Sequence, residues 1–196
     1  LEEWLDALAS SAPAPGGGAV AALHAATGAA LIEMVCNLTI GKPKYAAVEE
    51  IMRSAREEAG GLRAAALDLG EQDAEVFTAV TQAYKIPRDD PTRSDRIQAA
   101  LVDAAEIPRR TAETAQRIVD LAEKIAGGAN TAVLSDVVVA LYSARAAIES
   151  ALVNIRINAS SIKDTAVVAE LTDAISGFDR EIRRAELLAR TVAARI

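Results

Sequence analysis

The sequence predicts an all-α protein, built as one antiparallel bundle of long helices. Hydrophobic residues make up 51% of the 196 residues, but aromatic residues only 3%. The core therefore has to be built from Ala, Leu, Val and Ile, which favours closely spaced helices over a sandwich of sheets. Apolar residues recur at a period near 3.6, and no stretch of any length alternates as a strand would.

Glycine and proline are confined to a few short clusters, which leave long segments free to form helices. Helices are predicted over residues 1–9, 17–39, 43–84, 93–106, 108–126, 131–160 and 164–195. Several of these are longer than an average globular helix, as is common in antiparallel bundles. No low-complexity linker or repeat interrupts the pattern, so residues 1–196 are expected to form a single domain.

Composition excludes several classes of function. The net charge of −7 disfavours nucleic-acid binding, so an anionic ligand would need a local positive patch. A single cysteine, Cys36, excludes an internal disulfide and a cysteine-based metal cluster, and no other metal-ligand cluster stands out. The apolar run 19–38 contains His24, Glu33 and Asn37, so we expect no membrane span and a soluble, cytoplasmic protein.

The stretch from Ser11 to Tyr45 combines three features of a binding cleft. Gly16, Gly17 and Gly18 precede a long apolar segment, and Lys42 and Lys44 follow it. The glycines match a dinucleotide-binding fingerprint only formally, because a proline-rich turn and not a strand precedes them. They are either a plain entry into a helix or a place where a ligand contacts backbone N–H groups at a helix N-terminus.

Asp73 lies in the middle of an apolar helix face. With about 100° per residue, it falls within about 20° of the centre of the stripe. That stripe is formed by Leu62, Leu69, Val76, Phe77 and Val80, whereas Asp68, Glu71 and Glu75 fall on the opposite face. A carboxylate on a core face is costly unless it is paired or borders a polar cavity, and burial raises its pKa. Asp73 is therefore either a proton shuttle or a structural residue bonded to a neighbouring helix.

A second stripe, on the helix predicted over 131–160, is made of small and polar residues. Its members are Asp136, Ala140, Ser143, Ala147, Ser150, Asn154 and Asn158. Such a stripe permits close helix packing or lines a wet groove. Asp136 and Asn154 would lie about 27 Å apart along a straight helix, so they serve opposite ends of a long ligand or different sites.

These pieces, in this order, resemble the formiminotransferase-cyclodeaminase C-terminal family, which includes methenyltetrahydrofolate cyclohydrolases. The matching segments are Pro15–Ala22, Met34–Tyr45, Asp73–Phe77, Ile86-Pro87, Arg96–Ala100, Ile107-Pro108, Ser135-Asp136 and Asn154–Asn158. Each is weak alone, but the ordered set covers nearly the whole chain.

The resemblance implies an all-helical homodimer that binds folate, including polyglutamylated folate, as its substrate and needs no metal or other cofactor. It implies either cyclisation of 5-formiminotetrahydrofolate with release of ammonia or hydrolysis of 5,10-methenyltetrahydrofolate, and it leaves the two open. Asp73 matches the family's proposed catalytic aspartate. Gly16 to Gly18, Lys42, Lys44, Asn154 and Asn158 are then expected to bind the substrate, the lysines through its glutamate tail. The alternatives are a non-catalytic helical dimer or folate-binding module, and a hydrolase acting on another anionic or amidine-like substrate.

Overall fold

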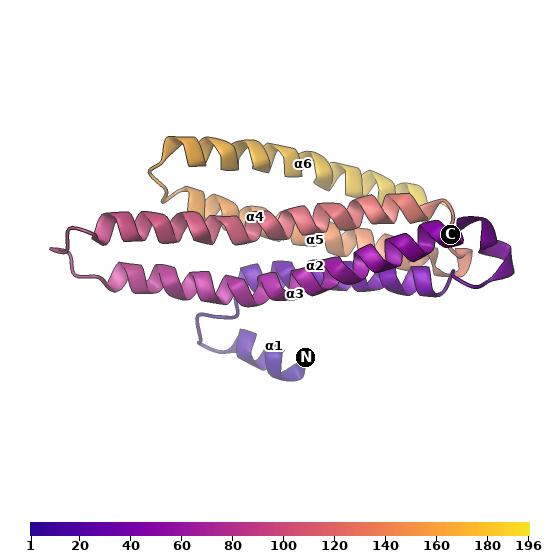
Figure 1. The fold of residues 1–196 in the computed structure, drawn as a ribbon, viewed down its shortest axis with the longest axis horizontal. Coiled ribbons are helices and arrows are strands. Elements are labelled where there is room, and N and C mark those ends of the chain that lie inside the picture. Colours follow the sequence, from indigo (N-terminus) through magenta and orange to yellow (C-terminus); the bar gives the residue numbers. More distant parts are fainter.

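The computed structural model describes all 196 residues and contains six α-helices, two short 3-10 helices and no strand, which confirms the all-α prediction. The α-helices are α1 (Glu2–Ala9), α2 (Gly17–Asn37), α3 (Glu49–Lys85), α4 (Arg93–Ala126), α5 (Leu134–Ala159) and α6 (Thr165–Ala193). The 3-10 helices are η1 (Pro43–Val48) and η2 (Thr131–Val133). Figure 1 shows α2 to α6 running along the long axis of the molecule, with α1 set apart from them.

The bundle is held together by small aliphatic side chains. α2 packs against α3 and α5, α4 packs against α3 and α5, and α6 covers α5. The main core cluster draws its residues from all five of these helices. At Gly28 the approach of α2 to α5 is so close that a β-carbon there would lie 3.2 Å from the carbonyl oxygen of Ala140. The abundance of alanine and glycine is therefore what allows the long helices to pack at short distance.

The prediction of two helices over 93–106 and 108–126 is wrong, because α4 runs unbroken through Pro108. A proline inside a helix has no N–H to donate, so the carbonyl oxygen four residues earlier loses its partner. Here that oxygen belongs to Ala104, and the side-chain Nδ2 of Asn158 on α5 donates a hydrogen bond of 2.8 Å to it. The neighbouring helix thus supplies the bond that the proline removes.

Replacing Asn158 with Ala is expected to destabilise the bundle by about 1–3 kcal/mol, because the Ala104 carbonyl would be left buried without a partner. Chemical denaturation would measure this loss. In a chain that also carries Pro108→Ala, the restored backbone N–H can bond to Ala104, and the cost of Asn158→Ala should shrink. An equal cost in both backgrounds would contradict this role of Asn158.

The prediction of one helix over 43–84 is also wrong at its start, where η1 precedes α3 as a separate turn. Tyr45 explains the break, because its hydroxyl group donates to Oδ1 of Asn130 and accepts from the backbone N–H of Thr131. These bonds tie the turn to the segment before α5 and hold it off the line of α3. The remaining helix ends lie within a few residues of their predicted positions.

Two helical segments, Gly17–Asn37 and Thr131–Ala159, are long and apolar enough to cross a membrane by length and composition. In their most apolar stretches, 56% and 44% of the residues are buried inside the bundle. The core helix of a soluble protein passes the same test, so this finding is weak evidence for a membrane span.

Candidate functional site

A cavity of about 340 Å³ opens where α2 begins, between α3, α4 and α5. Its lining comes from the segment before α2 and from these four helices. The lining residues are Pro13, Ala14, Gly16, Gly17, Gly18, Asp73, Val76, Phe77, Val80, Ala104, Asn154, Ile157 and Asn158. Asp73 is the one ionisable side chain among them, so the cavity surrounds a single carboxylate with apolar and amide groups.

The carboxylate of Asp73 lies directly against the first turn of α2. A β-carbon at Gly18 would overlap the carboxylate, and all three of its nearest neighbours would be carboxylate atoms. Burial raises the pKa of Asp73 above the ordinary value of 3.8, and a hydrogen bond with the backbone N–H of Ala19 partly opposes this rise. A carboxyl group with a raised pKa exchanges a proton more readily near neutral pH than an exposed aspartate does.

The helical wheel of α3 predicted the acidic residues correctly but placed Phe77 wrongly. Asp68, Glu71 and Glu75 are exposed and Asp73 is partly buried, as predicted. The Phe77 side chain, predicted to be buried, is 46% exposed. The reason is that α3 and α4 reach beyond the first turn of α2, as Figure 1 shows, so α2 does not cover this part of the α3 face.

The glycine run provides space and not an unusual backbone conformation. Gly41 is the one glycine with a positive φ, so Gly16, Gly17 and Gly18 adopt backbone angles open to other residues. At Gly18 a side chain would displace Asp73, whereas a β-carbon at Gly17 would meet the Asn154 amide at an ordinary 3.8 Å. The position that has to be glycine is therefore Gly18.

Asn154 and Asn158 present oriented amides to the cavity. Nδ2 of Asn154 donates to the carbonyl oxygen of Ser150 at 3.0 Å, and Nδ2 of Asn158 donates to Ala104. These bonds fix the amide planes and leave both side-chain oxygens without an intramolecular donor. Each oxygen can then accept a hydrogen bond from a ligand N–H group.

Lys42 and Lys44 do not line this cavity. They follow the C-terminal end of α2, and the 21 residues of that helix separate them from Gly17 by about 30 Å. The Lys44 ammonium lies 5.3 Å from the ring centre of Tyr45. Of the residues predicted to form one site, the structure brings together Asp73, the three glycines and the two asparagines, and leaves the lysines beyond the opposite end of α2.

Sequence reasoning gave no functional role to two side chains that line the cavity. The side chains of Phe77 and Ile157 are 46% and 62% exposed, although both are large and apolar. An aromatic ring and an aliphatic side chain at a cavity suit a flat heterocyclic ligand. Both lie in segments that match the family, Asp73–Phe77 and Asn154–Asn158, but the sequence does not show that their side chains are exposed at a cavity.

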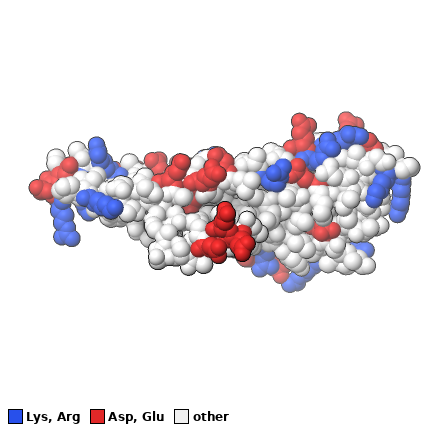
Figure 2. Space-filling model, turned by 90° about the horizontal axis from the view of Figure 1, so that it is seen from below, with Lys and Arg blue, Asp and Glu red and all other residues white.

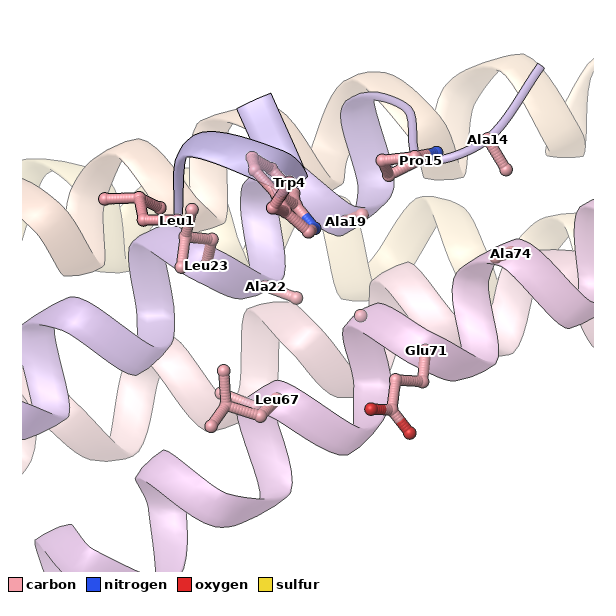
Figure 3. Close-up of a pocket in the computed structure, with 12 residues that line it drawn as sticks. Leu1, Trp4, Ala14, Pro15, Ala19, Ala22, Leu23, Leu67, Glu71 and Ala74 are labelled. Carbon is pink, nitrogen blue, oxygen red and sulfur yellow. The ribbon is translucent and has the colours of Figure 1, made fainter. Parts of the chain in front are cut away.

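A larger hollow of about 480 Å³ lies under α1 and is a weaker candidate. Figure 3 shows Leu1 and, on α1, Trp4 above Ala19, Ala22 and Leu23 of α2, with Leu67 and Glu71 of α3 on the other side. Its lining is apolar apart from Glu71, which is exposed. No desolvated titratable group faces it, so the cavity at Asp73 is the stronger candidate for the functional site.

The charges of the surface are unevenly distributed. On the face shown in Figure 2, acidic side chains gather in the middle, and Lys and Arg are visible toward both ends of the molecule. An anionic ligand would thus find positive charge near the ends of the bundle, despite the net charge of −7. No group of three or more His, Cys, Asp or Glu side chains is arranged to hold a metal ion.

The fold and the cavity together define a class of protein: a helical bundle whose candidate site carries one desolvated carboxylate suited to moving protons. The family model described as formiminotransferase-cyclodeaminase matches residues 1–177. The chain belongs to this family, as its sequence motifs indicated.

The relatives of the chain carry two related names. A methenyltetrahydrofolate cyclohydrolase from Methylorubrum extorquens is 41% identical over 182 residues, which cover 91% of this chain and 88% of that protein. A formimidoyltransferase-cyclodeaminase from Sus scrofa is 32% identical, and the match covers 93% of this chain but only 35% of that longer protein. The crystal structure of formiminotetrahydrofolate cyclodeaminase from Thermotoga maritima superimposes with a TM-score of 0.91 at 29% identity, covering 98% of this chain and 94% of that one.

Proposed function

We propose that the protein is an enzyme that hydrolyses 5,10-methenyltetrahydrofolate to 10-formyltetrahydrofolate. The observation that carries this proposal is the single desolvated carboxylate of Asp73 in a cavity lined by glycines and amides. The reaction needs one group that moves protons. The 41% identical relative, which matches over most of its own length, is named for this reaction.

In this mechanism Asp73 moves every proton. It takes a proton from water as the water oxygen bonds to the methenyl carbon, and this gives a neutral tetrahedral adduct. It then donates a proton to N5 as the bond between that carbon and N5 breaks, and it takes the hydroxyl proton as the formyl carbonyl forms. One proton is released to solvent overall. Asn154 and Asn158 would accept hydrogen bonds from the pterin and hold the carbon near Asp73.

The second candidate is cyclisation of 5-formiminotetrahydrofolate, which is favoured by the name of the structural relative with a TM-score of 0.91. In that reaction the formimino nitrogen first takes up a proton from solvent, and N10 then attacks the formimino carbon to give an adduct with an amino group. N10 loses its proton to the carboxylate, and the amino group gains that proton and leaves as ammonia. The same carboxyl group can serve both proton transfers, so the cavity accommodates either reaction.

Absorbance of the methenyl compound distinguishes these functions with purified protein. Loss of absorbance from added 5,10-methenyltetrahydrofolate supports the hydrolase. Gain of absorbance from the formimino compound, with release of ammonia, supports the cyclodeaminase. Binding of either folate without turnover would overturn both and support a folate-binding module.

The proposal extends to a cytoplasmic homodimer that accepts polyglutamylated folates. Exposed apolar side chains on α2 and α5, among them Met34, Val139 and Ile157, support association with a second copy. Lys42 and Lys44 remain our prediction for the glutamate tail because they are cationic and exposed. Light scattering would measure the dimer, and the KM for folates with one and several glutamates would measure the contribution of the tail.

A further inference from the structure

Helix α1 has an apolar side that is only partly covered. Its apolar residues, together with the residue before the helix, fall within about 100° of one another, and its acidic residues fall on the opposite side. The apolar residues are Leu1, Trp4, Leu5 and Leu8, and the acidic residues are Glu2, Glu3 and Asp6. No residue of α1 is buried, and the side chains of Leu1 and Leu5 are 82% and 49% exposed. Figure 1 shows α1 apart from α2 to α6, the helices that pack together.

Apolar contacts alone hold α1 to the bundle. The hydrogen bonds of residues 1–12 all stay within that segment, and the side chains of Glu2, Glu3 and Asp6 form no ion pair. A helix of eight residues does not persist in water without packing against something else. The helical state of α1 therefore reports whether its apolar side is in contact with the bundle.

The surface of α2 and α3 under α1 is a groove rich in small residues. In Figure 3, Leu1 and Trp4 lie on one side of this hollow and Leu67 of α3 lies on the other. The small residues that line it are Ala19, Ala22, Ala66, Gly70 and Ala74. Small residues in the groove and large apolar side chains on α1 are complementary in shape. The hollow of about 480 Å³ thus leaves room for the apolar side of α1 to move inward.

The hollow and the Asp73 cavity share a wall. Ala14 lines both of them, Pro15 lines the hollow and Pro13 lines the cavity. Ala19 lines the hollow, and its backbone N–H bonds to the carboxylate of Asp73. Because the two prolines restrict the linker between α1 and α2, a movement of α1 is passed on to this wall and not absorbed by the linker.

We propose that α1 and the linker at residues 10–16 form a strap, which closes on the groove between α2 and α3 and sets the wall of the Asp73 cavity. In the closed state Trp4 packs toward Leu67, and residues 13–16 are held against the cavity. A ligand that touches this wall then binds the closed state more tightly, and closure strengthens the binding of the ligand by the same factor. That the ligand is a folate rests on the proposed function, whereas the docking of α1 does not.

Hydrogen exchange at the amides of α1 tests the docking, because an undocked α1 loses its helix. Leu67→Asp places a charge in the hollow at a side chain that is 50% exposed, so the bundle itself should fold normally. In this variant the amides of α1 should exchange at the rate of an unfolded peptide. The matched control is Leu187→Asp on α6, at a side chain that is 67% exposed, and it should exchange like wild type. Equal protection of α1 in both variants, or protection that rises with protein concentration as it would for docking on a second copy, would overturn the strap.

The effect of a bound folate tests the link between the strap and the cavity. Addition of 5-formyltetrahydrofolate should slow exchange in α1 of the wild-type protein by about five-fold or more, the lower limit of a usual coupling between sites. Calorimetry should show that Leu67→Asp raises the Kd of the same folate by an equal factor, because coupling between two equilibria is reciprocal. Folate binding that leaves α1 exchange unchanged, or an equal Kd in Leu67→Asp and Leu187→Asp, would overturn this link.

Labelling of a cysteine in the cavity tests the same link without folate. Val80 is half-buried and lines the Asp73 cavity, and the native Cys36 is buried, so Val80→Cys can be labelled over a low background. A bulky maleimide should react several-fold faster when Leu67→Asp is also present and at an unchanged rate with Leu187→Asp. Equal rates would overturn the effect of the strap on the cavity. A protein that binds no folate would instead refute the proposed function, and exchange and labelling would still decide the strap.

Discussion

Replacing Asp73 with Asn is expected to slow turnover of the folate substrate by roughly 100- to 10,000-fold, the usual contribution of a positioned acid or base. The substitution keeps the shape of the side chain and its contact with Gly18 but removes the group that exchanges protons. KM should change little, because the cavity lining is otherwise intact. Steady-state kinetics of the methenyl compound would measure both constants.

The same substitution should stabilise the protein at neutral pH. Burial raises the pKa of Asp73 in the folded state above 3.8, so the folded protein binds this proton more tightly than the unfolded chain. Ionisation above pH 3.8 therefore costs stability, and that cost grows until the pH passes the folded pKa. An uncharged amide at this position carries no such cost, so the advantage of Asp73→Asn should be present at pH 7 and should vanish as the pH falls toward 3.8.

Glu75→Gln is the matched control for both measurements, because Glu75 is exposed on the opposite face of the same helix. It should leave turnover and its pH dependence unchanged. If Asp73→Asn kept wild-type turnover of both folates, Asp73 would not be the proton carrier. If it lost turnover without any gain in stability at pH 7, the role of burial in setting the pKa would be wrong.

Periodicity predicts the helices well because each long helix buries a face that the sequence itself encodes. It fails at Pro108. A proline normally ends a helix, but here a side chain from α5 supplies the missing hydrogen bond and the helix continues. It fails again at Tyr45, whose hydroxyl group bonds to a segment 85 residues away. In both places a contact between distant parts of the chain decides the local structure. The hydrophobic periodicity of one helix cannot predict such a contact.

The sequence predicts those site residues that stand out on the face of a single helix. Asp73 stands out on the helical wheel of α3 because its carboxylate interrupts an apolar stripe. Phe77 does not, because its exposure reflects the end of α2 and not its own helix. The lysines are assigned to the site from their order in the chain, and the fold places them beyond the other end of α2.

Gly18→Ala is expected to lower turnover by roughly 100-fold. This is the usual loss of rate when a catalytic group is displaced by about 1 Å. The new methyl group would occupy the space of the Asp73 carboxylate, so the carboxylate has to rotate away. The fold should survive, because an aspartate side chain can move more easily than a backbone and alanine favours the helix by about 0.5–1 kcal/mol over glycine. The variant should thus melt no lower than wild type while its kcat falls.

Gly17→Ala separates this effect from a general effect of alanine in the first turn of α2. It gains the same helix propensity, but its β-carbon meets Asn154 at 3.8 Å, an ordinary contact. We expect it to be as stable as Gly18→Ala and to keep turnover close to that of wild type. Equal losses in the two variants would mean that the glycine run acts through backbone contacts with the ligand. A loss confined to Gly18→Ala would mean that the glycine is there to hold the catalytic carboxylate in place.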